Sequence, residues 1–185
     1  MIELVQLSTW HPAFVAAIHA HYTGSLGAPP GKKLAWEIIE DGAHRGWLGL
    51  GEPCFKLAAR RRLGIEDARP LPGTVSNFIY RLDANGPTLA SAILKAWHVQ
   101  AEAEWLGRYH EKPIHWETLV DPNEVKSTGS TVPGACFRRA GYRSLGMTTG
   151  RSARRPAGST HGPRIWQDAS PKLVLYRGPL NRIAA

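Results

Sequence analysis

Residues 75–82 read VSNFIYRL, and residues 114–120 read IHWETLV. Both are short apolar segments rich in β-branched and aromatic residues, which predicts two strands. Between them, residues 88–109 read TLASAILKAWHVQAEAEWLGRY and repeat apolar side chains at helical spacing along one broad face. A strand, a long helix and a second strand in this order predict a parallel crossover.

The flanking segments extend the alternation of helices and strands. We expect helices over 9–22, 53–63 and 134–140, a hairpin of strands 35–40 and 45–50 around EDGAH, and strands over 142–147 and 172–176. Residues 151–171 are predicted to be irregular and basic, ahead of the final strand. The expected fold class is α/β (α+β), with one domain over residues 1–185 and a central mixed sheet flanked by helices.

Composition excludes several classes of protein. No apolar run approaches about 20 residues, so a transmembrane helix is not expected. Two cysteines argue against a disulfide scaffold and against a zinc site of four thiolates. The start MIELVQLSTW lacks the basic and apolar parts of a signal peptide, and we expect a cytoplasmic protein.

Charge is distributed unevenly along the chain. Residues 138–185 hold 10 Lys or Arg and a single acid, Asp168, whereas the preceding 137 residues are almost neutral. A basic segment on a neutral body is typical of a protein that binds a polyanion, although a solubilising tail has the same charge. Trp166 and Tyr176 lie among these arginines and could stack on bases.

The order of elements resembles the GNAT N-acyltransferase superfamily. Particular segments resemble two related groups, the Mom-type phage proteins that hypermodify adenine in DNA and the Druantia-type anti-phage protein A family. The likeness covers roughly residues 15–180, and the segments that carry it are HYTGS (21–25), RGWLGLGEPCFKLAARRRLG (45–64), FIYRL (78–82), TLASAIL (88–94), ETLVDP (117–122) and GACFRRAGYRSLGMTTGR (134–151).

The resemblance to the Mom group implies a GNAT-like fold and a transferase that modifies a nucleobase amine, adenine above all, in DNA. Matched motif to motif, its active residues correspond to Tyr22, Arg81, Ser91 and Asp121. It implies a bacterial or phage-infected host cell. The resemblance to the Druantia-type group implies a different role, a DNA-binding module of anti-phage defence or transposition.

Asp121 and Arg81 can also be interpreted from their positions. Asp121 follows a predicted strand at the end where open α/β sheets place ligands, and its carboxylate could accept a proton from an amine. An aspartate before proline is equally typical of a turn. Arg81 closes an apolar strand and needs a carboxylate, a phosphate or access to water there. It is either a site residue or part of a salt bridge to Glu117 or Asp121.

Ser91 lies in the first turn of the long helix, where free N–H groups favour an anion. A small residue packed between helix and sheet explains it equally well. Gly86 and Thr88 precede this helix and are the candidates for holding an activated donor, acyl-CoA or another. Residues 83–88 read DANGPT, however, so the Q/R-x-x-G-x-G/A pyrophosphate motif of ordinary GNAT enzymes is missing. Tyr22 borders a loop rich in glycine and proline that forms either a substrate loop or a hinge.

No spacing of histidines and cysteines is a metal motif, so no metal ligand is assigned. An iron or zinc site assembled in three dimensions from His19 or His21 with Asp121 stays open. Phosphate contacts are expected from the basic residues Arg60, Arg61, Arg62, Arg151, Arg154, Arg155 and Arg164. The cluster at 60–62 would alternatively be a solvated helix end.

The leading hypothesis is therefore a GNAT-like transferase that acts on a base in DNA. Its partners would be a small-molecule donor and either duplex DNA with a flipped base or single-stranded DNA. The DNA-binding module without this chemistry is the alternative. An ordinary N-acetyltransferase of small molecules is disfavoured by the missing pyrophosphate motif.

Overall fold

The computed structural model describes residues 1–21, 28–53, 72–124, 132–148, 151–154, 165–168 and 170–179. Its main sheet has seven strands, in the spatial order β1 (Ile2–Leu7), β2 (Lys33–Glu40), β3 (Ala43–Gly51), β4 (Thr74–Leu82), β5 (His115–Val120), β9 (Leu173–Arg177) and β6 (Arg143–Met147). Among the strands in the described ranges, only β4 and β5 of this sheet pair in parallel, and the other neighbours are antiparallel. The predicted mixed sheet is confirmed.

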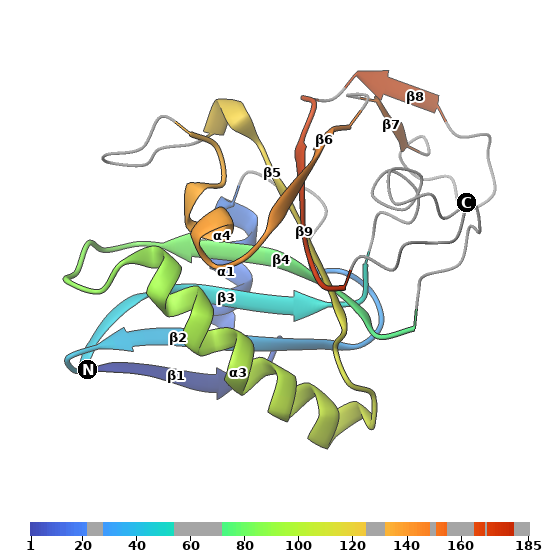
Figure 1. Ribbon diagram of the computed structural model, residues 1–185. Coiled ribbons are helices and arrows are strands. Elements are labelled where there is room, and N and C mark those ends of the chain that lie inside the picture. Colours follow the sequence, from blue (N-terminus) through green and yellow to red (C-terminus); the bar gives the residue numbers. More distant parts are fainter. Residues whose placement is uncertain are drawn as a thin grey trace.

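Helices cover both faces of this sheet (Figure 1). The helices α3 (Ala90–Tyr109) and α4 (Ala135–Arg139) lie on one face, and α1 (Pro12–Ala20) lies on the other. The larger core lies beneath α3 and includes Trp36, Trp97 and Trp105, all buried. A smaller core packs α1 onto the opposite face through Phe14 and Trp47, whose ring centroids are 6.0 Å apart.

Two expectations about local structure are confirmed. The hairpin β2–β3 turns on Asp41 and Gly42, which have φ angles of 52° and 79°. This pair of positive φ angles is what a two-residue hairpin loop needs, and an Asp-Gly sequence supplies it at low cost. The parallel crossover β4–α3–β5 is also present, with its helix close to the expected range.

Two expectations need correction. The edge strand β1 was not expected, because six residues at a terminus carry little periodicity. The segment predicted to be irregular contains a two-stranded ribbon, β7 (Arg151–Arg154) paired with β8 (Ile165–Asp168). The helix expected over 53–63 lies almost wholly outside the described residues.

Candidate functional site

A wedge opens between the two parallel strands. The pairing of β4 with β5 runs from Thr74–His115 to Asn77–Thr118, although β4 continues to Leu82. Figure 1 shows the two strands diverging beyond this point. A β-bulge coincides with the divergence, because Asn77 and Ile79 face consecutive residues of β3 and Phe78 is the extra residue between them. Bulges bend a strand and re-aim its backbone, and they are enriched next to active sites.

Buried polar side chains hold the bulge in place. The Asn77 amide donates hydrogen bonds to the carbonyls of Gly49 and Ile79, each at 3.1 Å. The Thr118 hydroxyl donates to the Asn77 carbonyl at 3.0 Å and so joins β5 to the bulge. Both side chains are almost fully buried, so their hydrogen bonds fix where the strands part.

The first turn of α3 borders the wedge on one face of the sheet. The Tyr80 hydroxyl donates to the Ala90 carbonyl at 2.8 Å, and its ring packs edge-on against Phe137 of α4. Burial raises the pKa of Tyr80, so the hydroxyl keeps its proton. Within the described part of the chain, no protein acceptor bonds the N–H groups of Leu89, Ala90 or Ser91. This helix start therefore keeps the donors that suit an anion.

The structure places Ser91 between α3 and the sheet. Its side chain is buried, with 9% of the residue exposed. This position agrees with the packing interpretation of Ser91. The backbone N–H of Ser91, in the first turn of α3, is then the group of this residue that could contact a ligand.

The loop before α3 is tied to a buried ion pair. Arg45 pairs with Glu40, and their side chains are 6% and 5% exposed. Arg45 also donates to the carbonyls of Gly86 and Thr88, and the Thr88 N–H donates to Glu40 at 2.9 Å. The N–H of Thr88 is thus already engaged by protein. A role of Gly86 and Thr88 in holding a donor stays a prediction.

Arg81 lies on the opposite face of the sheet, beside α1. Its guanidinium pairs with Asp83 and donates to the Ala17 carbonyl at 3.5 Å. Asp83 is thus the salt-bridge partner, and neither Glu117 nor Asp121 forms that bridge. Burial, together with the positive charges of Arg81 and Lys172, lowers the pKa of His21 to about 4. His21 is therefore neutral at pH 7.

Asp121 is buried at the end of β5 with several donors around it. Its carboxylate accepts hydrogen bonds from the Asn123 N–H at 2.9 Å and the Ser170 hydroxyl at 3.1 Å, and it pairs with Lys172. Burial alone raises the pKa of Asp121, but the hydrogen bonds from Lys172, Asn123 and Ser170 outweigh it and lower that pKa. The expected turn is present as the one-turn helix η2 (Pro122–Glu124). Asp121 is consequently an ionised and weak base.

Two residues of this polar cluster, Ser170 and Lys172, were given no role from sequence, and His21 was considered only as a metal ligand with Asp121. These three residues, with Arg81 and Asp121, we call the strand-end cluster. The only signal for Lys172 was its place at the start of the final strand. It reaches Asp121 because Leu173 pairs with Val120, which brings two segments 51 residues apart together.

The basic ribbon, formed by β7 and β8, leaves the main sheet at the end where Lys172 meets Asp121. Thr148 and Lys172 join the ends of β6 and β9 through two backbone-directed hydrogen bonds of 2.8 and 2.9 Å. Beyond them lies the ribbon of β7 and β8 (Figure 1). The strand β7 carries Arg151 and Arg154, and Arg151 is opposite Asp168 in the strand register. Tyr22, Arg60, Arg61, Arg62, Arg155 and Arg164 lie outside the described residues, so their predicted roles stay predictions.

The stacking role predicted for Tyr176 is wrong. Tyr176 is 3% exposed, its hydroxyl donates to the Pro179 carbonyl at 2.8 Å, and His115 lies 2.6 Å from the same oxygen. Its ring faces the interior because it alternates along β9 with residues on the other side, and it is not available to a base.

Metal ligation and membrane spanning were searched over the described ranges. In these ranges no three His, Cys, Asp or Glu side chains gather in a way that could hold a metal ion. His21 and Asp121 therefore do not form such a group with a third described ligand. No helix in the described ranges has the length and apolar character that crossing a membrane requires.

Comparison with known proteins identifies the fold. No protein-family model and no curated protein sequence matches this chain. Solved structures do: the aminoglycoside acetyltransferase AAC(6')-Ib in complex with coenzyme A and kanamycin has a TM-score of 0.52 at 12% identity, covering 96% of this chain and 95% of that one. An acetyltransferase of Bacillus subtilis in complex with CoA has a TM-score of 0.51 at 10% identity, covering 96% and 97%.

These similarities show a GNAT acetyltransferase fold, as the order of elements predicts. At such low identity they establish architecture and leave the substrate open. They carry no sign of a relationship to the Mom-type or Druantia-type groups.

Proposed function

We propose that this protein transfers an acyl or similar group to an exocyclic amine of a base in DNA. The observation that carries the proposal is the bulged wedge between β4 and β5, with the first turn of α3 on one face and the strand-end cluster at its mouth. A donor and an acceptor could thus approach one point from the two faces of the sheet.

The donor side suits an anionic activated group. The N–H groups of Leu89, Ala90 and Ser91 point out of the start of a 20-residue helix, where the helix dipole favours negative charge. Two structural neighbours are described as complexes with coenzyme A, so an acyl-CoA is the first donor to test. Such a thioester supplies an electrophilic carbonyl and a thiolate that departs with the amine's proton.

The acceptor side suits a neutral amine that must be oriented. The Asp121 carboxylate can accept a hydrogen bond from an amine N–H, but its lowered pKa makes it a poor proton acceptor. His21 is neutral above about pH 4, so its ring can accept a hydrogen bond from the amine, while the amine's proton leaves with the thiolate. Arg81 would hold a negatively charged oxygen near the reacting centre.

The basic quarter of the chain supports DNA as the carrier of the amine. The ribbon with Arg151 and Arg154 starts at the edge of the sheet where Asp121 lies, so phosphate contacts and the wedge would be adjacent. Arg155 and Arg164 belong to the same basic segment. A base inside a duplex would have to flip out, at a cost of a few kcal/mol.

A second candidate is a DNA-binding module without transferase chemistry. It is favoured by the bond between the Thr88 N–H and Glu40, which occupies a donor in the loop where GNAT enzymes bind pyrophosphate. The missing pyrophosphate motif at residues 83–88 agrees with it.

The decisive experiment is mass spectrometry of nucleosides from the DNA of cells that express the protein. A new nucleoside mass supports the transferase, and its level should fall about 100-fold in Asp121→Asn, because the amine loses the carboxylate that orients it. Glu3→Gln is the matched control, because it also removes one carboxylate charge but from an exposed site on β1. Unmodified DNA together with tight, salt-sensitive binding would instead support the DNA-binding module.

A further inference from the structure

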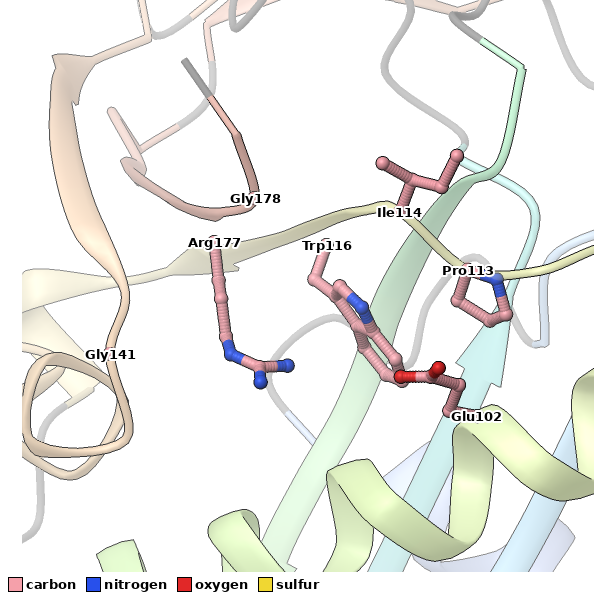
Figure 2. Close-up of a pocket in the computed structure, with 7 residues that line it drawn as sticks. All are labelled: Glu102, Pro113, Ile114, Trp116, Gly141, Arg177 and Gly178. Carbon is pink, nitrogen blue, oxygen red and sulfur yellow. The ribbon is translucent and has the colours of Figure 1, made fainter.

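A second pocket lies at the other end of β5, away from the wedge. Its volume is about 340 Å³, which lies at the small end of the range for ligand sites. Figure 2 shows seven lining residues: Glu102, Pro113, Ile114, Trp116, Gly141, Arg177 and Gly178. Trp116 and Asp121 are five residues apart on one strand, so the pocket is about 16 Å from the strand-end cluster.

Arg177 brings an uncompensated positive charge to this pocket. Its guanidinium lies 5.9 Å from the centre of the Trp116 ring, and in Figure 2 the two side chains point into the same space. Among the described residues, no carboxylate or carbonyl accepts a hydrogen bond from this guanidinium. As far as the described residues are concerned, its five N–H donors are available to a ligand.

The acid in the pocket does not neutralise Arg177. Glu102 pairs instead with Lys112, with 3.0 Å between Oε1 and Nζ. The neighbouring His98 adds no charge, because burial and the positive charge of Arg177 lower its pKa to about 3. When Lys112, the partner of Glu102, is counted with the two charged lining residues, the surroundings of the pocket carry a net positive charge.

Two glycines leave the guanidinium open. Gly141 follows α4 with a φ of 95°, which disfavours any side chain, and a Cβ there would lie 3.8 Å from Arg177 Nε. Gly178 also lines the pocket, and a Cβ on it would lie 2.8 Å from the Ile114 carbonyl oxygen. Backbone rather than side chains therefore forms these two walls.

We propose that this pocket binds an oxyanion, a carboxylate or a phosphate, that is held by the Arg177 guanidinium. A planar guanidinium matches the two oxygens of either group, and its position over the Trp116 ring helps to orient it. Pro113 and the half-exposed Ile114 offer apolar contact to a short body attached to the anion. The site is separate from the wedge and does not depend on the proposed transfer reaction.

The oxyanion could belong to a free small molecule or to a DNA backbone, and one set of variants separates the two. Calorimetry with inorganic phosphate, adenosine 5′-monophosphate and butyrate tests the free ligands, and salt-dependent binding of a short duplex tests DNA. Arg177→Met removes the charge and keeps the length of the side chain. Arg108→Met is the matched control, because Arg108 also lies 5.8 Å from an aromatic ring centre, that of Tyr109, but on the exposed side of α3.

We expect Arg177→Met to lower the affinity for the ligand about tenfold or more, and Arg108→Met to leave that affinity unchanged. A loss confined to the free anions identifies a small molecule. A loss confined to the duplex, with a salt slope about one unit shallower, identifies a DNA phosphate. Equal binding by Arg177→Met and the native protein, or no binding of any probe, overturns the proposal.

A second variant keeps the test informative if Arg177→Met fails to fold. Glu102→Gln removes a carboxylate that is 38% exposed, so the fold should tolerate it. Removing this negative charge from the pocket should tighten anion binding a few-fold. Weaker or unchanged binding in Glu102→Gln would count against an anion site.

Discussion

Acid should destabilise this protein through two histidines, the buried His98 and the partly buried His21. His98 is 3% exposed, its Nε2 lies 2.9 Å from the Tyr142 hydroxyl, and its ring lies 4.9 Å from that of Trp116. Burial and the nearby Arg177 charge lower the pKa of His98 to about 3. Burial, with Arg81 and Lys172, lowers the pKa of His21 to about 4.

The sign and size of the effect follow from proton linkage. In the unfolded chain each histidine takes up a proton below about pH 6.5, whereas in the folded protein neither does until about pH 4 or lower. The unfolded state therefore binds two more protons between these limits. The free energy of unfolding falls by about 2.7 kcal/mol for each unit by which the pH is lowered. Relative to pH 7, the free energy of unfolding at pH 5 should be about 4 kcal/mol lower. Burial also lowers the pKa of His115, which adds to the slope in the same direction.

Urea unfolding curves at pH 7, 6 and 5 measure this slope. His98→Gln removes one titrating group and keeps a polar side chain near Tyr142, so about 2 kcal/mol of the loss should disappear. His19→Gln is the matched control, because His19 is exposed on α1, and its slope should equal that of the native protein. A native slope near zero, or the same slope with and without His98, would refute the linkage.

Three further outcomes are expected. Asp121→Asn should lower the free energy of unfolding by about 1–3 kcal/mol, because the new amide would face the Lys172 ammonium without a compensating charge. Adding Lys172→Met should restore part of that loss in the same urea assay. A double variant no more stable than the single one would contradict the pairing. Gly46→Ala should cost about 2–4 kcal/mol in thermal melts, since a Cβ there would lie 2.1 Å from the Arg81 carbonyl oxygen, and a native-like melting temperature would show that the strands can yield. Neutralising Arg151, Arg154 and Arg155 together should weaken binding to all DNA sequences alike. The slope of log affinity against log salt concentration should become shallower by up to about 3 units. Unchanged binding would exclude the basic segment from the interface.

Much of the architecture could be predicted from local patterns. The helical spacing of apolar residues over 88–109, the Asp-Gly turn at 41–42 and the strands on either side of α3 each depend on neighbours in sequence. A crossover joining two strands has one favoured arrangement, so the parallel pair β4–β5 followed from the order of elements. The place of Asp121 at a strand end was predictable for the same reason.

Contacts between distant segments decided the rest. The insertion of β9 between β5 and β6 depends on which edge a late strand can reach, and no local pattern encodes it. That pairing buries Tyr176, which the sequence presented as a possible stacking residue, and it brings Lys172 onto Asp121. Periodicity and charge along the chain thus determined the elements and the basic quarter, whereas sheet register determined which charges meet, because a strand's partners are set by long-range hydrogen bonding and burial.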